Sequence, residues 1–334
     1  MENIIVIGLG SMGKRRIRLI GKIKNDVHII GVDGREDRRI EALDMCNEYK
    51  IDIETVSSME DIPLETKIYA AFICTSPISH GQNISQCEKR GYNVFTEINL
   101  IRDLYEDNIK SAKKNGKVLY LSSTPMFRKE IQFIRDNVKV SRNLNYIFHV
   151  GQYLPDWHPW ESYKDFFISD SRTNGCREIM AIEFPWLIDC FGKISHIEVS
   201  TSRQTNLDIN FNDSYNIIIE HENGNRGVFI VDVVCRFPVR YFEVSGEDLF
   251  ITWNGKADGL KKYNLEKKEL ETVDLYSTVH HKDGYNVMII ENAYEEELKD
   301  FFEVLEGTKK ALYTFEDDLE TLKLIDGVEN VKNR

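Results

Sequence analysis

The chain has 334 residues, a length typical of two domains or one large one, and its apolar content of 42% is ample for a globular core. The net charge of −12 argues against a nucleic-acid partner, because phosphate binding requires a basic surface. No run approaches the ~18 consecutive apolar residues of a membrane helix, and no basic-then-apolar leader precedes the first strand pattern. We therefore expect a cytoplasmic protein with no membrane partner.

The six cysteines and eight histidines are scattered along the chain. They include no C-x-x-C pair and no spacing typical of a metal site. This usage is typical of reduced thiols in the cytosol rather than of a disulfide framework. We therefore expect no bound metal.

The first 24 residues read as a strand, a glycine-rich turn and a helix. Three glycines of the turn have G-x-G-x-x-G spacing, in which the first allows a sharp bend, the second lets the backbone approach a pyrophosphate and the third lets the helix pack on the strand. The free N–H groups at the start of such a helix suit a phosphate. The residues predicted to hold the pyrophosphate are Gly8, Gly10, Ser11, Met12 and Gly13.

A second strand pattern ends at Asp33, 20 positions after Gly13. A carboxylate at this place can accept hydrogen bonds from the ribose hydroxyls of a dinucleotide. Asp33 favours NAD because its charge would repel a 2′-phosphate, whereas Arg35 and Arg38 could bind one, so NADP stays possible. The alternative is a glycine-rich turn without a ligand; the strand, the helix and the carboxylate together favour a dinucleotide site.

Strands and helices alternate through about residue 122, which predicts a doubly wound parallel sheet of the Rossmann type. Pro77 fits the first turn of the helix after the fourth strand, where its missing N–H costs nothing. His80, one turn further on, could contact the nicotinamide or serve packing alone. The strands should end together at one ligand-binding crevice, at Gly8, Asp33, Thr75 and Glu97.

Beyond about residue 140, short alternating strands separated by turn signals predict a mainly antiparallel sheet with one buried face. A helix over 177–190 interrupts them, and helices near 294–305 and 316–328 close the chain. We therefore expect an α/β protein with a dinucleotide-binding domain over residues 1–122 and a substrate and oligomerisation domain over 123–334. The C-terminal helix is in a position to pack back on the first domain.

These features, taken in order, resemble the Gfo/Idh/MocA family of NAD(P)-dependent oxidoreductases over essentially the whole chain. Besides the glycine turn, the segment from Thr75 to His80 and a helix ending at Gly192 carry the resemblance. The resemblance implies a Rossmann domain joined to an α/β domain whose open antiparallel sheet forms homodimers or homotetramers. It also implies a small sugar-like substrate.

The catalytic positions of this family are occupied differently here. Glu97, Ile98 and Asn99 stand where the family has Glu-Lys-Pro, whose lysine is the usual proton-handling residue. Counting back from the glycine at the end of the helix places Glu178 at the family's aspartate and Ile182 at its acid/base histidine. In this register both usual proton-handling positions are vacant.

The segment 156–163 is dense in side chains suited to replace them. His158 titrates near neutrality and is the best single general acid/base candidate, with Asp156 able to orient it. Trp157 and Trp160 offer flat faces for a sugar ring, and Glu161 could hold hydroxyls. The alternative, that the loop plugs the domain interface and the histidine is structural, stays open.

Two further residues are site candidates through the resemblance. Glu178 could assist the proton transfer, and Arg128 matches a family position that approaches the substrate, although surface arginines are common. The leading hypothesis is hydride transfer between NAD(P) and a sugar or sugar nucleotide. The second is a non-catalytic dinucleotide-binding sensor, which the vacant lysine and histidine positions favour and the dense loop disfavours.

Overall fold

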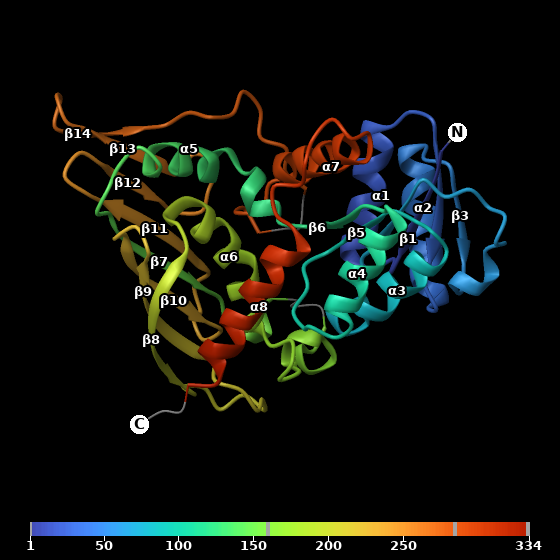
Figure 1. Cartoon of the computed structure of the whole chain (residues 1–334), viewed down its shortest axis with the longest axis horizontal. Helices are drawn as coiled ribbons and strands as arrows, with labels where there is room; N and C mark the ends of the chain where they lie inside the picture. Colours follow the sequence, from blue (N-terminus) through green and yellow to red (C-terminus); the bar gives the residue numbers. More distant parts are fainter. Residues whose placement is uncertain (1, 158–160, 283–285, 332–334) are drawn as a thin grey trace. The chain divides into compact units, whose positions relative to one another are not determined.

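A computed structural model describes residues 2–157, 161–282 and 286–331 of the chain (Figure 1). The chain folds into two compact units. The first comprises Met1–Ser123 and Tyr294–Glu320, and the second Thr124–Ala293 and Thr321–Arg334. The first unit is therefore discontinuous in sequence, and it takes in a segment of the C-terminal region besides the expected N-terminal domain.

The first unit is built on a six-stranded parallel sheet with the strand order β3-β2-β1-β4-β5-β6. This is the order of the dinucleotide-binding Rossmann fold, in which the chain reverses direction across the sheet between β1 and β4. It confirms the predicted fold class. The strands are β1 Glu2–Ile7, β2 Val27–Val32, β3 Ile53–Val56, β4 Ala70–Ile73, β5 Val94–Thr96 and β6 Leu119–Leu121. The helices are α1 Ser11–Ile23, α2 Glu36–Tyr49, α3 His80–Lys89, α4 Tyr105–Asn115 and α7 Glu291–Leu305.

Helix α7 supplies part of the core of this unit from the far end of the chain. The ring of Phe301 lies 5.3 Å from the rings of Phe72, Phe95 and Tyr120, on three neighbouring strands of the sheet. Leu298 of the same helix is also fully buried in this cluster. Edge-to-face aromatic pairs add to the free energy of burying each ring, so α7 is an integral part of the first unit.

The second unit is built on an eight-stranded sheet with the order β14-β13-β12-β11-β7-β10-β9-β8. Burial alternates along β9, so one face is buried and the other exposed. Helices α5 Lys129–Val138 and α6 Gly175–Phe191 lie along one side of this sheet (Figure 1). The strands are β7 Asn145–Gly151, β8 Ile194–Ser202, β9 Ser214–His221, β10 Arg226–Asp232, β11 Val239–Ser245, β12 Phe250–Trp253, β13 Leu260–Asn264 and β14 Glu269–Thr272.

The sheet differs from the sequence prediction in two respects. β7 and β10 are paired parallel, because β7 is inserted between two strands that follow it much later in the chain. Helix α5 and the strands β13 and β14 were not predicted. The two strands are short and rich in charges, whereas α5 carries Ile131, Ile134 and Val138 at helical spacing, a signal that the sequence prediction missed. The sheet is therefore mixed, although its other pairs are antiparallel.

The last helix, α8 Phe315–Glu329, contributes its first residues to the first unit and its last residues to the second. All six cysteines are unpaired. Across the described residues, no helix has both the length and the apolar character needed to cross a membrane.

Candidate functional site

The glycine turn has the geometry that a dinucleotide requires. Gly8 has a φ of +93°, and a Cβ on it would lie 2.7 Å from the Cys74 carbonyl oxygen. A Cβ on Gly13 would lie 1.9 Å from the Gly8 carbonyl oxygen, so no larger residue fits at either place. At Gly10, by contrast, a Cβ would meet only the Arg38 guanidinium, at 3.7 Å. The surface over Gly10, at the N-terminus of α1, is therefore open to a ligand.

This opening fits a pyrophosphate. Gly10 is the N-cap of α1 and has no side chain to cap the helix, so the helix end itself is left to hold an anion. Ser11 and Met12 form the first turn of the helix, and the Met12 sulfur accepts a hydrogen bond from Arg15 at 3.1 Å. The five residues predicted to hold the pyrophosphate therefore lie together in the structure.

Asp33 lies beside the turn, at the end of β2. Its carboxylate accepts hydrogen bonds from the backbone N–H of Leu9 at 2.8 Å and of Arg35 at 2.9 Å. A carboxylate has about four acceptor positions, so two remain for ribose hydroxyls. The Arg35 guanidinium is paired with Asp37, whereas Arg38 lies 3.7 Å from Asp33. Of the two arginines considered for a 2′-phosphate, Arg38 is therefore the one next to the ribose-binding carboxylate.

Thr75, Pro77 and His80 follow β4, as the sequence indicated. Pro77 begins a short 3-10 helix, and the Thr75 hydroxyl accepts a hydrogen bond from Ser79 at 2.8 Å. The His80 ring is 1% exposed, with Nδ1 2.9 Å from the Asn99 side-chain oxygen and Nε2 2.9 Å from the Thr75 carbonyl oxygen. Burial lowers the pKa of His80. Because both ring nitrogens are engaged, His80 stabilises the segment between β4 and α3.

Glu97, at the end of β5, belongs to a buried ion cluster that the sequence did not reveal. Its carboxylate accepts two hydrogen bonds from the Arg16 guanidinium, at 2.6 and 3.2 Å. Arg16 also donates to Glu297 at 2.7 Å and to Ser122 at 3.1 Å. Burial alone would lower the pKa of Arg16, but the two carboxylates raise it. These partners are 81 and 281 positions apart from Arg16 in the chain, so no local pattern could have shown them.

The loop at the start of the second unit is only partly described, and His158 and Trp160 lie outside the described residues. Asp156 is exposed, and its carboxylate lies 3.9 Å from the Arg236 guanidinium. The indole N–H of Trp157 donates to the Gln152 carbonyl oxygen at 2.9 Å. Glu161 is exposed.

Glu178 lies in the first turn of α6, and its environment is that of a titrating group. The helix begins because the Asn174 side chain accepts a hydrogen bond from the Arg177 N–H at 2.9 Å. Glu178 is half-buried as a residue, but its Oε2 atom is inaccessible and has no hydrogen-bond partner in the described part of the chain. Burial raises the pKa of Glu178 to about 7. A carboxyl with this pKa can take up or release a proton at neutral pH.

The candidate Arg128 and a second charged residue of α6, Glu183, are engaged in ion pairs. Glu183 is fully buried, is paired with Arg240 and accepts a hydrogen bond from Trp186 at 2.6 Å. Arg128 is 6% exposed, pairs with Glu130 at 2.6 Å and lies over the Trp253 ring, 4.8 Å from its centroid. These contacts give Arg128 a structural role within the unit.

The described ranges contain no group of three or more His, Cys, Asp or Glu side chains placed to hold a metal ion. The site that the structure does define is the open N-terminus of α1 with Asp33 beside it. This geometry is that of a dinucleotide-binding Rossmann protein.

Comparison with known proteins agrees with this assignment. Residues 2–122 match the family model described as "Oxidoreductase family, NAD-binding Rossmann fold", the Gfo/Idh/MocA family. The match thus covers the first unit's N-terminal segment and identifies residues 2–122 as similar to the NAD-binding domain of this family. A search of curated proteins gives no significant match.

Solved structures show that the likeness extends over both units. UDP-N-acetylglucosamine 3-dehydrogenase GnnA from Acidithiobacillus ferrooxidans is 15% identical, with 98% of this chain and 96% of that chain covered and a TM-score of 0.74. An oxidoreductase from Agrobacterium radiobacter, solved with NAD+, L-tartaric acid and magnesium, is 12% identical, with 97% and 94% covered and a TM-score of 0.77. Levoglucosan dehydrogenase, solved with NADH, is 15% identical, with 98% and 95% covered and a TM-score of 0.78. At these identities the likeness establishes a shared fold over the whole chain.

Proposed function

We propose that the protein is an NAD-dependent oxidoreductase that transfers a hydride between the nicotinamide and a carbinol carbon of a sugar or sugar nucleotide. The observation that carries this proposal is the dinucleotide-binding turn with Asp33 beside it, and the buried Oε2 atom of Glu178, which has no hydrogen-bond partner among the described residues, supports the choice of base. The sugar class is supported by the names of two structural neighbours, which are dehydrogenases of UDP-N-acetylglucosamine and of levoglucosan.

The dinucleotide-binding turn, Asp33 and Glu178 each have a role in this proposed reaction. The helix end at Gly10 binds the pyrophosphate, and Asp33 binds the adenosine ribose through its two remaining acceptor positions. NAD, when bound there, would supply the hydride acceptor. Glu178 removes the hydroxyl proton as the carbinol is oxidised, and it returns the proton in the reverse direction. Above its pKa of about 7 the carboxyl is ionised and ready to accept that proton.

The proposal is tested by turnover and its pH dependence. Purified protein is screened against nucleotide sugars and free sugars for a change at the absorbance band of the reduced nicotinamide. For oxidation, kcat/KM of the wild type should rise through about pH 7, because the ionised form of Glu178 is the base. Glu178→Gln should lower kcat by about 10² to 10⁴ and leave NADH binding unchanged.

Glu198→Gln is the matched control, since this glutamate lies on β8 with its side chain 69% exposed. It should keep full activity. If Glu178→Gln retained wild-type kcat with the same pH profile, Glu178 would not be the base, and His158 would become the candidate to test.

We also propose that the exposed face of the eight-stranded sheet forms a homodimer or homotetramer. Ile147 and Ile218 are each more than 40% exposed and alternate with buried residues along β7 and β9, and Leu270 on β14 is 47% exposed. Covering such side chains releases about 25 cal/mol per Å² of apolar surface. Ile218→Glu should therefore dissociate the oligomer in sedimentation velocity, and a wild-type monomer would contradict the proposal.

We propose that the protein works in the cytoplasm. The unpaired cysteines support placement in this reducing compartment.

A further inference from the structure

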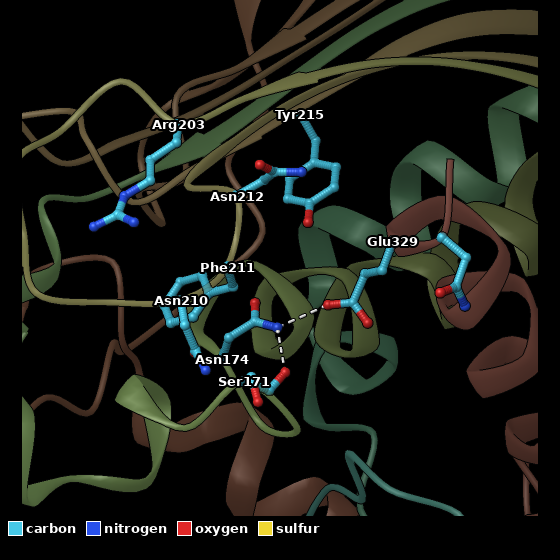
Figure 2. A pocket seen from close by; sticks show the side chains of 9 residues that line it. Ser171, Asn174, Arg203, Asn210, Phe211, Asn212, Tyr215 and Glu329 are labelled. Atoms are coloured by element: carbon cyan, nitrogen blue, oxygen red, sulfur yellow. Dashed lines mark hydrogen bonds between the residues drawn. The ribbon is translucent and has the colours of Figure 1, made fainter. Parts of the chain in front are cut away.

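The second unit contains a cavity of about 560 Å³ that has no assigned role (Figure 2). Its walls come from three segments of this unit: the turn before α6, the connection from β8 into β9, and the C-terminal end of α8. The volume lies in the range of small-molecule sites and is ample for a sugar ring.

The wall formed by the β8–β9 connection is held in shape without a ligand. Asp213 is fully buried and accepts hydrogen bonds from the backbone N–H groups of Gln204 at 2.7 Å and Thr205 at 2.9 Å. An ion pair of 2.6 Å between Lys164 and Asp208 ties the same connection to a neighbouring segment. Because the wall is ordered in advance, a ligand does not bear the entropic cost of arranging it.

The floor of the cavity is a polar network in which one guanidinium pairs with two carboxylates. The Asn174 side chain is 1% exposed and donates to Glu329 at 2.7 Å and to the Ser171 carbonyl oxygen at 3.1 Å. Glu329 is also paired with Arg177. Figure 2 shows the Tyr215 hydroxyl and the Glu329 carboxylate turned toward the same space. Because Arg177 also pairs with Asp326 at 2.6 Å, the floor presents hydrogen-bonding atoms together with one more carboxylate than guanidinium.

The remaining wall residues define the chemistry of the ligand. Asn210, Asn212 and Asn330 bring side-chain amides, each with donors and an acceptor, and Phe211 brings one aromatic ring. A sugar hydroxyl likewise donates and accepts, so a row of amides and hydroxyls matches the edge of a polyhydroxylated ring. An apolar ligand would leave these groups unpaired at a cost of about 1–3 kcal/mol each.

A strongly anionic ligand fits less well. Among the described residues that line the cavity, Arg203 is the one cation, and its guanidinium donates to the Leu207 carbonyl oxygen. Recognition of phosphate usually employs several such donors. We infer that the cavity binds a neutral polyhydroxylated ring, as a free hexose or N-acetylhexosamine or as the sugar unit of a nucleotide sugar.

The test measures binding to the full chain by isothermal titration calorimetry in the absence of NAD(H). The probes are glucose, N-acetylglucosamine, UDP-N-acetylglucosamine and inorganic phosphate. Binding of N-acetylglucosamine alone would indicate a free sugar, and much tighter binding of UDP-N-acetylglucosamine would indicate the sugar unit of a nucleotide sugar. Asn210→Ala and Asn212→Ala should each weaken sugar binding about threefold to tenfold, the effect of losing one hydrogen bond.

Asn216→Ala is the matched control, because Asn216 lies on the same strand as Tyr215 with its side chain exposed and does not line the cavity. It should bind the sugars like the wild type. Absence of binding by every sugar would overturn the inference, as would sugar binding unchanged in both cavity variants. Binding of phosphate alone, lost in Arg203→Met, would assign the cavity to anions instead. Because no dinucleotide is present, each of these results leaves the proposed hydride transfer to its own test.

Discussion

The buried ion cluster of the first unit gives the most demanding prediction. Arg16 is fully buried and is the cation that both Glu97 and Glu297 contact. In Arg16→Met, two buried carboxylates would face one another without it. Breaking a buried ion pair by removing one partner costs about 3–5 kcal/mol, so the free energy of unfolding of the first unit should fall by that amount at pH 8. Burial already raises the pKa of Glu297, and loss of Arg16 would raise it further.

The sign of the pH dependence follows from the raised pKa of Glu297. Between the unfolded and the folded pKa, the folded variant binds protons that the unfolded chain releases, so its stability falls as pH rises. The decrease in the free energy of unfolding of Arg16→Met, relative to wild type, should therefore be largest at pH 8 and become smaller toward pH 5. Glu297→Gln, which removes the surplus negative charge and keeps an acceptor oxygen, is the matched control and should change stability by less than about 1.5 kcal/mol.

The assay is urea unfolding followed by far-ultraviolet circular dichroism and by tryptophan fluorescence. All four tryptophans lie in the sequence of the second unit, so the fluorescence transition reports that unit and circular dichroism reports both. In Arg16→Met, the first unit should unfold at a lower urea concentration than the second, so the circular dichroism signal should begin to fall before the tryptophan fluorescence changes. If the free energy of unfolding of Arg16→Met at pH 8 lay within about 1 kcal/mol of the wild-type value, the loss would be well below the expected cost and the reasoning would be refuted.

Three further predictions concern single positions. Gly10→Ala should fold normally and bind NADH more weakly, whereas Gly13→Ala should also lower the melting temperature, because its Cβ would meet backbone at 1.9 Å; equal melting temperatures would contradict this contrast. Asp33→Asn should shift preference toward NADPH by removing the charge that repels a 2′-phosphate, and unchanged relative affinities in fluorescence titrations would count against that role. Asp232→Ala should lower the stability of the second unit by about 1–3 kcal/mol, because His149 and two backbone N–H groups lose their acceptor; an unshifted tryptophan transition would argue otherwise.

The parallel sheet and the dinucleotide turn could be predicted because their signals are local. Gly8, Gly10 and Gly13 stand within six positions, and the spacing to Asp33 is set by one strand–helix–strand unit. Each glycine is required by the backbone of its immediate neighbours, so the motif carries its own structural reason. The match of residues 2–122 to the family model covers the same local features.

The remaining parts of the site depend on contacts between distant segments. Arg16 reads as one charge in a basic helix, and only the fold brings Glu97 and Glu297 to it. The cavity of the second unit joins residues near 171, 210 and 329, which are far apart in the sequence, and the sequence analysis did not predict it. Glu178 was identified by its place in a family pattern, while its raised pKa comes from burial that sequence does not display.

The late position of α7 in the sequence has a consequence for folding of the protein during synthesis on the ribosome. All six strands of the first sheet are made by residue 121, but Leu298 and Phe301, which complete its core, are made more than 170 residues later. At translation rates of about 5–20 residues per second, the nascent sheet waits roughly 10–35 s for its last helix. During that time the rings of Phe72 and Phe95 lack their partner, so the unfinished first unit is a substrate for chaperones until the chain is nearly complete.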